Sequence, residues 1–384
     1  MRIANWKMKT ALAGFLAVSG MAWAGAQQPA PAASSAIAAP AASNSGADIP
    51  QIQNAKLDTR TLSTSLSQTL QQLIDRADKA QWIGYSVPEV SGQRTVCCGN
   101  YNSEENICRT CRLENENANG VTISGEKNRI IKLEGPRQLF VLYRLEAKHV
   151  TRIRLASEDC TLDFGGLSLV WLAGVKPSES VQFLAGFTRN EDVDRHDIAQ
   201  GALSAIAMHQ DSSADRALES FVSPQQSEAT RKQAAFWLGG ARGKFGFETL
   251  KQMARSDPSS EVRSHVTFAL SISSQPAAID EMIRMAHDDS STHVRGQALF
   301  WLAQKAGKKA IGVIDGAIAD DPDTDVKKKA VFALSQLPKD DGVPKLIQVA
   351  QNNRNPEVRK QAMFWLGQSN DPRALQFFEK VLLQ

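Results

Sequence analysis

The sequence has few cysteines, and all of them lie in the first half of the chain. Among 384 residues there are five, and none follows Cys160. Chemistry that depends on a thiol is therefore excluded from residues 161–384. The four cysteines before Cys160 lie close together, at Cys97, Cys98, Cys108 and Cys111.

Long hydrophobic runs are also missing. Beyond the first 26 residues, no stretch approaches the roughly 18 apolar residues that a membrane-spanning helix needs. Residues 1–26 combine a basic start (Arg2, Lys7 and Lys9), a short apolar segment at 11–18 and small residues at 22–26, which is typical of an export signal. We predict an exported protein, periplasmic or extracellular, without stable membrane insertion. An uncleaved anchor is the alternative.

A large excess of charge of one sign is absent too. The chain has 44 Lys and Arg against 41 Asp and Glu, a formal net charge of +3. The predicted signal holds three basic residues and no acidic ones, so its removal leaves a charge of about zero (3 minus 3). Because nucleic-acid binding needs a basic footprint, we predict no nucleic-acid partner.

Recognisable catalytic motifs are missing as well. The six histidines are scattered and none lies beside a glutamate. Gly165-Gly166 has no following lysine to bind a phosphate, and no nucleophile elbow is present. We therefore predict no catalytic residues, no metal and no cofactor, and a non-enzymatic function in preference to an enzymatic one.

Three interpretations of the cysteines remain open. Structural disulfides are favoured, because an exported chain meets oxidising conditions. They would join Cys97 or Cys98 to the 108–111 turn, and the other of the two to Cys160. A zinc site fits loosely, and the Cys108–Cys111 spacing suits a redox pair without its usual strand-to-helix context. Five is an odd number, so one thiol stays free or pairs between chains.

The first half of the chain divides into a linker and a small mixed domain. Residues 27–54 are rich in Ala, Pro and Ser and predict a flexible linker. Within residues 55–176, apolar residues three and four apart over Ala55–Trp82 predict one amphipathic helix, with Asp58 and Thr59 as caps. Four segments rich in β-branched and aromatic residues predict a small antiparallel sheet against this helix: 129–133, 138–145, 149–155 and 167–172.

The second half is organised by a repeat. The segment VRSHVTFALS (262–271) returns at a fixed interval of 32 residues, and each copy has a basic residue at its second position. Two amphipathic helices fit each copy, and each unit needs its neighbours to bury the rest of its apolar surface. Residues 177–384 are therefore predicted to form an α-solenoid of about six helix hairpins. The basic residues are Arg231, Arg263, Arg295, Lys327 and Arg359.

These copies resemble HEAT repeats, in particular the short bacterial kind grouped with phycobilisome-lyase HEAT-like repeats. The second helix of that family reads roughly V-R-x-x-A-x-x-A-L-G, which VRGQALFWLA (294–303) and VRKQAMFWLG (358–367) follow. The resemblance implies a fold of HEAT-like helix hairpins and says little about function. A lyase or chaperone for a chromophore is an alternative by family name alone. The His-Glu metal pairs of HEAT-type deoxyhypusine hydroxylases are absent.

HEAT units also carry an acidic residue six positions before the basic one. Asp257, Asp289 and Asp321 fulfil this, whereas Gln225 and Asn353 depart from it. We interpret the pattern mainly as a ladder in which each carboxylate accepts hydrogen bonds from the next turn or the neighbouring arginine.

Aromatic residues recur in the second helix of each unit. One column alternates large and small, as Trp237, Ala269, Trp301, Ala333 and Trp365, so that each Trp fills space left by an Ala next door. Beside it, a phenylalanine occupies every unit. These rings either pack into the neighbouring repeat, which we favour, or form an aromatic ladder on the concave surface. They are Phe236, Phe268, Phe300, Phe332 and Phe364.

The function predicted from these features is non-catalytic recognition of a protein or peptide on the concave second-helix surface. The alternatives are a thiol-redox or metal-binding N-terminal domain, and the chromophore lyase. The last helix, Pro372–Leu383, carries Phe377 and Leu383 as a possible edge for a homodimer. The residues predicted to line the docking surface are Arg231, Lys232, Arg263, Arg295, Lys327, Lys328, Arg359 and Lys360.

Overall fold

The computed structural model describes residues 49–90, 95–98, 110–114, 121–124, 137–158, 160–188 and 196–383. The predicted signal, most of the predicted linker and the predicted strand at 129–133 lie outside this part of the chain. No helix in the described part is long and apolar enough to cross a membrane. Residues 46–384 form one compact unit that holds both a sheet and a helical array.

The main sheet has five strands in the order β2-β10-β3-β7-β8. It confirms the strands predicted at 138–145, 149–155 and 167–172, and it corrects the expectation of an antiparallel sheet. The strands β3, β7 and β8 pair antiparallel, but β10 pairs parallel with both β2 and β3. The sheet is therefore mixed. The strands are β2 (Lys56–Thr61), β3 (Gln81–Pro88), β7 (Gln138–Glu146), β8 (His149–Ser157) and β10 (Ser168–Ala173).

The helix predicted over Ala55–Trp82 is much shorter in the structure. It is α1 (Leu66–Asp75), and its cap is Ser65, whose side chain accepts a hydrogen bond from the Gln68 amide. The first part of the predicted helix is the strand β2, so Asp58 and Thr59 are not caps. The cause is non-local, because β2 gains its hydrogen bonds from β10, more than a hundred residues later.

Shorter strands lie beside the main sheet and include part of the predicted linker. They are β1 (Gln51–Gln53), β4 (Thr95–Cys98), β5 (Thr110–Arg112), β6 (Val121–Ser124) and β9 (Thr161–Asp163). The strand β9 lies between β1 and β5, and β4 pairs with β6. A compact cluster of buried residues that includes Trp82, Phe164 and Trp171 forms here, separate from the larger core that continues from the sheet into the helices.

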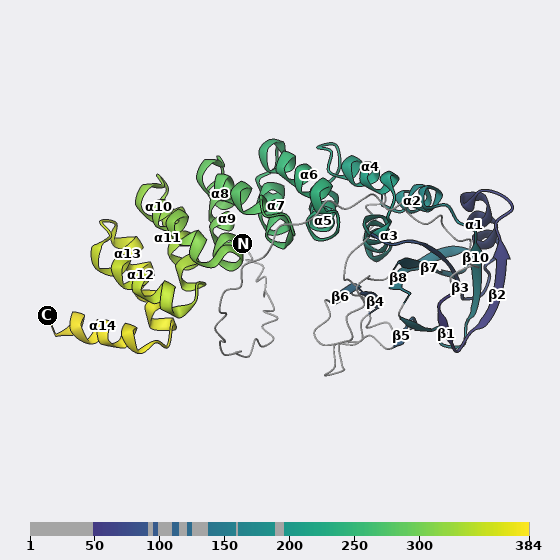
Figure 1. The fold of residues 1–384 in the computed structure, drawn as a ribbon, viewed down its shortest axis with the longest axis horizontal. Helices are drawn as coiled ribbons and strands as arrows, with labels where there is room; N and C mark the ends of the chain where they lie inside the picture. The colour runs from purple at the N-terminus through teal and green to yellow at the C-terminus, as the bar shows by residue number, and fades with distance from the viewer. Residues whose placement is uncertain are drawn as a thin grey trace, which may run out of the picture. The chain divides into compact units, whose positions relative to one another are not determined.

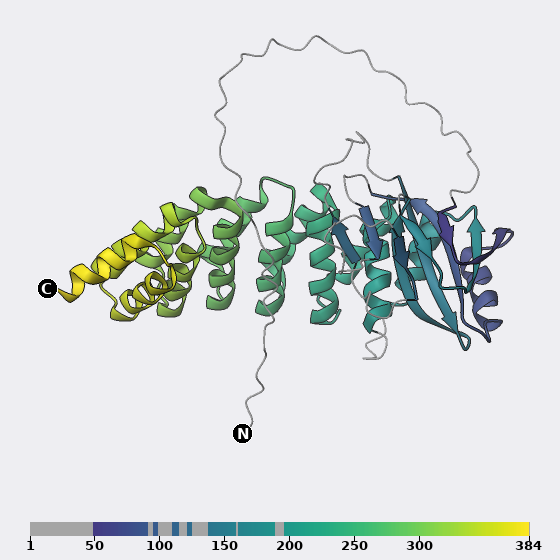
Figure 2. The same ribbon diagram turned by 90° about the horizontal axis from the view of Figure 1, so that it is seen from below.

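From Pro177 onward the described chain is helical. Pro177 lies in the first turn of α2, as predicted. The helices lie side by side in chain order (Figure 2). They are α2 (Pro177–Ala185), α3 (His196–Met208), α4 (Ser212–Phe221), α5 (Glu228–Ala241), α6 (Gly243–Ser256), α7 (Ser260–Ile272), α8 (Ala278–Asp288), α9 (Thr292–Ala306), η2 (Gly307–Ala310), α10 (Ile311–Asp320), α11 (Thr324–Ser335), α12 (Lys339–Asn352), α13 (Pro356–Gln368) and α14 (Pro372–Leu382).

Two layers make up the array. The first helices of the units, α4, α6, α8 and α10, lie along one side of the row, and the second helices, α5, α7, α9 and α11, lie along the other (Figure 1). The hairpins α2/α3 to α12/α13 agree with the predicted number of about six, and α14 follows them. The apolar columns of the second helices, such as Val262, Val266 and Leu270, are buried completely.

A buried polar chain joins the sheet to the first helices of the array. His209 Nδ1 lies 2.6 Å from the Ala205 carbonyl oxygen, and His209 Nε2 lies 2.8 Å from Ser180 Oγ. Because a carbonyl oxygen only accepts, Nδ1 carries the proton and Nε2 accepts from the Ser180 hydroxyl. Ser180 Oγ in turn lies 2.7 Å from the Tyr85 hydroxyl, and Tyr85 lies 2.7 Å from the Tyr143 hydroxyl. In this arrangement the imidazole is neutral, because burial disfavours its charged form.

Acidification should weaken this junction. Burial lowers the pKa of His209 from 6.5 to about 4, against the opposing effect of the hydrogen bond to the Ala205 backbone. Between pH 6.5 and 4 the unfolded chain binds a proton that the folded chain excludes, so stability falls as the pH falls through this window. We expect His209 to contribute a loss of about 3 kcal/mol in the free energy of unfolding by pH 4. Urea titrations of wild type and His209→Gln at pH 7 and pH 4.5 measure the difference.

The control for this prediction is His149→Gln, because His149 is exposed. It should leave the pH dependence of the wild type unchanged. An identical pH dependence in the wild type and His209→Gln would show that His209 does not carry the effect.

Candidate functional site

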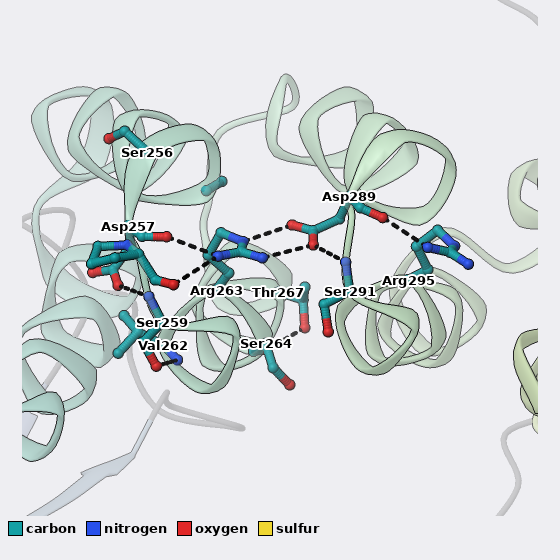
Figure 3. A network of polar contacts seen from close by, with 12 residues as sticks. Ser256, Asp257, Ser259, Val262, Arg263, Ser264, Thr267, Asp289, Ser291 and Arg295 are labelled. Carbon is teal, nitrogen blue, oxygen red and sulfur yellow. Dashed lines mark hydrogen bonds and ion pairs between the residues drawn. The ribbon is translucent and has the colours of Figure 1, made fainter.

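The predicted ladder of arginines and aspartates connects successive units. Arg263 on α7 donates from Nε and Nη2 to the two carboxylate oxygens of Asp289, at 2.9 and 3.0 Å. It also donates from Nη1 to the backbone oxygen of Asp257, at 2.8 Å. Figure 3 shows this guanidinium between the two aspartates. Each arginine therefore ties the turn of its own unit to the turn of the next one.

The same geometry recurs in the neighbouring units. Arg231 donates to both carboxylate oxygens of Asp257, at 2.9 and 3.1 Å, and Arg295 donates to both of Asp321, at 2.8 and 3.0 Å. The side chains of Arg231 and Asp257 are only 5% and 2% exposed. The hydrogen bonds from Arg263 to Asp289 raise the pKa of Arg263 above its ordinary value. Bidentate pairs of this kind are strong because both charges and geometry are satisfied.

The ladder ends where the sequence departs from the pattern. Lys327 occupies the arginine position of its unit, but its Nζ donates to the Ala319 backbone oxygen at 2.8 Å. Asn353, at the aspartate position of the next unit, accepts from the Asn355 amide through its side chain. Arg359 donates to the Asn353 backbone oxygen, as Arg263 and Arg295 do to the backbone oxygens of Asp257 and Asp289.

The prediction that the ladder arginines line an exposed docking surface is wrong for the buried members. Arg231 and Arg295 are buried, and Arg263 is nearly so, because each guanidinium faces the turn of the next unit. Lys232 and Lys328 are partly exposed and lie near acidic residues one turn away in their own helices, whereas Lys360 is exposed. The binding role of these lysines stays a prediction.

An aromatic ladder runs along the layer of second helices. Ring centroids lie 6.1 Å apart between Phe236 and Phe268, and 4.9 Å apart between Phe268 and Trp301. The series continues with Phe300 stacked on Phe332 at 5.7 Å and Phe332 against Trp365 at 4.8 Å. Within single helices, further contacts join each Trp to the preceding Phe. The rings thus form one continuous series from α5 to α13.

Both alternatives for the phenylalanine column therefore describe part of the arrangement. Phe236, Phe268, Phe300 and Phe332 are half-buried and pack on rings of the neighbouring repeat, while Phe364 is 54% exposed. Trp301 contacts Phe268, and Trp365 contacts Phe332. In both cases the phenylalanine belongs to the preceding unit, where the alternating column has alanine. The large and small residues of that column are thus complementary between neighbours, as predicted.

A hollow of about 400 Å³ opens on this layer between α5, α7 and α9. Phe268 and Trp301 supply aromatic surface, and polar side chains complete the lining. Those polar residues are Lys232, Glu261, Ser264, His265 and Gln297. Of these residues, the sequence pattern indicated only Lys232, Phe268 and Trp301, because the hollow depends on how three separate helices meet.

His265 is the most unusual residue of the hollow. Its ring contacts Phe268 edge to face at 5.7 Å, and it forms a hydrogen bond with the Lys232 backbone. The Nε2 atom is buried and has no hydrogen-bond partner. Burial, and then the charge of Lys232, lower the pKa of His265, so the ring is neutral at pH 7. Buried polar side-chain atoms are normally satisfied, so this unpartnered ring nitrogen is an exception in the described part of the chain.

Comparison with protein families supports the architecture. The model for HEAT repeats matches residues 216–303 and 315–384. From residue 216 onward, the helical array consists of HEAT repeats. No curated protein matches the chain.

Several solved structures of low identity are similar to about half of the chain. The complex of CpcE and CpcF of phycocyanin lyase from Nostoc sp. PCC7120 is 17% identical over 51% of this chain and 79% of that one, with a TM-score of 0.31. A Kap95p complex with RanGDP is 16% identical over 50% of this chain and only 30% of that one, with a TM-score of 0.35. A computationally designed armadillo repeat protein for modular peptide recognition is 18% identical over 50% and 99%, with a TM-score of 0.28.

The last helix of the HEAT array differs in part from its prediction. Phe377 is 6% exposed and packs into the core, so it does not form an apolar edge. Leu375 and Leu382 are exposed instead, together with Leu383, which is 88% exposed. A homodimer through α14 stays a prediction.

The cysteines are described only in part. Cys111 and Cys160 are fully buried in the small cluster beside the sheet. Cys97 and Cys98 lie on β4, and Cys108 lies outside the described residues. Within the described residues, no group of three His, Cys, Asp or Glu side chains is placed to bind a metal ion.

Proposed function

We propose that this HEAT-repeat protein is a non-catalytic scaffold that docks a protein or peptide on its layer of second helices. The observation that carries the proposal is the aromatic ladder. It runs continuously over five units, remains partly exposed and borders the hollow between α5, α7 and α9. Partly exposed aromatic side chains supply much contact area at little entropic cost, and they dominate many binding surfaces.

The ladder of ion pairs supports this function indirectly. It fixes each unit against the next through buried bidentate contacts, so the aromatic surface is formed before a partner arrives. A preformed surface loses little conformational entropy on binding. Within this proposal, the basic residue that contacts the partner is Lys232, which borders the hollow, and the arginines hold the scaffold.

The remaining candidates have less support. A thiol-dependent chromophore lyase would need a cysteine at the ligand, and residues 161–384 contain none. A metal or redox function would depend on the cysteines between residues 97 and 160 and would not use the aromatic ladder.

An envelope location is part of the same proposal. It rests on the signal-like residues 1–26 and on Cys111 and Cys160, which are buried and disulfide-bonded. Disulfides persist in oxidising compartments. Mass measurement of the purified protein after alkylation, with and without reduction, tests the idea. Alkylation of every cysteine without a reductant would contradict it.

Selection from a displayed library of random peptides tests the docking function. Peptides are selected on the wild type and counter-selected on Phe268→Ser, which removes one of the aromatic rings that line the hollow. Phe245→Leu is the matched control, because Phe245 is a half-buried ring on α6 in the other helix layer. We expect peptides that bind the wild type and Phe245→Leu but not Phe268→Ser. Failure to recover any peptide that binds the wild type and Phe245→Leu but not Phe268→Ser would contradict the proposal.

A further inference from the structure

The outer side of α13 and α14, at the end of the row of helices (Figure 1), repeats a surface that the array covers elsewhere. α13 carries VRKQAMFWLG (358–367) and α5 carries TRKQAAFWLG (230–239), so eight of these ten residues are identical. α7 packs on this surface of α5, whereas no further helix follows α14 among the described residues. We propose that α13 and α14 bind an amphipathic helix of another polypeptide, with an acidic residue in the turn before that helix.

Apolar side chains on this surface are exposed although their counterparts in the earlier units are buried. Met363 is 36% exposed and Leu382 is 85% exposed. The counterparts of Met363 are all completely buried, and those of Leu382 are buried as well. They are Ala235, Thr267, Leu299 and Val331 for Met363, and Ala254, Ala286, Ile318 and Ala350 for Leu382. Because the outer face of a terminal repeat is normally polar, an apolar one indicates a partner.

Arg359 has the donors of the ion-pair ladder but lacks the acceptor. Its Nη1 donates to the backbone oxygens of Asn353 and Arg354, at 2.8 and 3.1 Å. In the equivalent Arg231, Nε and Nη2 donate to the carboxylate of Asp257, in the turn before α7. Among the described residues no carboxylate accepts from these two atoms of Arg359, which is partly exposed. A planar pair of donors of this kind suits a carboxylate of the partner.

A glycine leaves room for the backbone of the bound helix. Gly239 on α5 lets α7 approach so closely that a Cβ atom would lie 2.1 Å from the backbone oxygen of Ala269. Gly367 occupies the same position on α13, where a Cβ atom would meet nothing within 4 Å. The place that the α7 backbone takes on α5 is therefore open on α13, and it suits a helix that packs equally closely.

Another polypeptide suits this surface better than a second copy of the chain. In the described array the aspartates at the ladder position are all engaged by an arginine of the preceding unit. They are Asp257, Asp289 and Asp321. Two-fold pairing of the surface with itself would also place Arg359 and the exposed Lys360 of both copies on one contact. Like charges there oppose association, whereas an acidic partner complements them.

A synthetic peptide of residues 257–273, with acetyl and amide ends, tests the proposal because it contains α7 and Asp257. Binding is measured by calorimetry on the wild type, Arg359→Gln and Gly367→Ala, after thermal melts show which variants fold. We expect Arg359→Gln to weaken binding at least about tenfold. Gly367→Ala should do the same, since its Cβ atom fills the space of the bound backbone. A peptide with Asp257→Asn should bind as weakly to the wild type as to Arg359→Gln.

Gly312→Ala is the matched control for the glycine variant. Gly312 also lies in a helix, α10, and a Cβ atom there would meet nothing within 4 Å. This variant should bind the peptide as the wild type does. Phe268→Ser should bind it equally well, because Phe268 lies on α7 and not on α13 or α14. Docking on the aromatic ladder and docking at this end of the row are therefore tested separately.

A fused chain removes the dependence on the free peptide, whose helix is marginally stable at this length. Residues 257–273 added after Gln384 place their aspartate 32 residues after Asn353, in register with the repeat. We expect the fused chain to melt at a higher temperature than the wild type. Gly367→Ala should lower the thermal midpoint of the fused chain but not that of the wild type.

Three results would overturn the proposal. The first is peptide binding that is indifferent to both Arg359→Gln and Gly367→Ala. The second is failure of the peptide to bind, together with a fused chain that gains no thermal stability. The third is a dimer in light scattering that Gly367→Ala dissociates, because the occupant of the surface would then be a second copy of the chain.

Discussion

Asp257→Ala should lower the free energy of unfolding by about 3–5 kcal/mol, because it removes the counter-ion of a buried arginine. Arg231 is 4% exposed, and both of its contacts with the Asp257 carboxylate would be lost. The same change removes the acceptor of the Ser259 amide. Chemical denaturation followed by circular dichroism measures the effect.

Asn353→Ala is the matched control for this prediction. Asn353 occupies the equivalent position in a later unit, where no arginine donates to the side chain and only the Asn355 amide does. We expect a loss of about 1 kcal/mol there. Adding Arg231→Met to Asp257→Ala removes the orphaned charge and should restore part of the stability. Similar losses at positions 257 and 353 would show that the ion-pair ladder does not hold the units together.

Gly239→Ala should destabilise the array by about 2–3 kcal/mol, because two helices approach each other closely at this residue. A Cβ atom on Gly239 would lie 2.1 Å from the backbone oxygen of Ala269, so α5 and α7 would have to move apart. That movement would also separate Phe236 from Phe268, which are in contact across the same pair of helices. The thermal midpoint and tryptophan fluorescence report both consequences.

Gly367→Ala provides a control with the opposite sign. Gly367 occupies the same column on α13, and a Cβ atom there would meet nothing within 4 Å. Replacing a helical glycine by alanine without a clash should stabilise the protein by about 0.5–1 kcal/mol. If both variants lose stability, the loss in Gly239→Ala would come from the geometry of the helix and not from the contact with Ala269.

The helical half was predictable because its information is local and repeated. The 32-residue interval, the apolar columns and the alternation of Trp237, Ala269 and Trp301 predicted the hairpins and their complementary packing. The interval between acidic and basic residues predicted the ion-pair ladder as well. The same interval could not show whether the arginines are buried or exposed. The burial of Arg231 and Arg295 depends on how neighbouring turns meet.

The N-terminal half was less predictable because its pairing is non-local. The apolar spacing within Ala55–Trp82 fits α1, but the chain before α1 becomes a strand through its hydrogen bonds with β10. No local pattern distinguishes parallel from antiparallel neighbours in that sheet. The hollow was missed for a related reason, since its lining comes from three helices, and a solitary histidine such as His265 gives no sequence signal.

Site-specific photo-cross-linking in the source cell tests the central claim most directly, which is that the layer of second helices contacts a polypeptide partner. A photoreactive amino acid is placed at Lys232, beside the hollow, or at Asp280, an exposed residue of α8 in the other layer. We expect discrete cross-linked species from position 232 that disappear in Phe268→Ser and persist in Phe245→Leu, and none from position 280. Cross-links from position 280 alone, or from position 232 regardless of Phe268, would contradict the docking function.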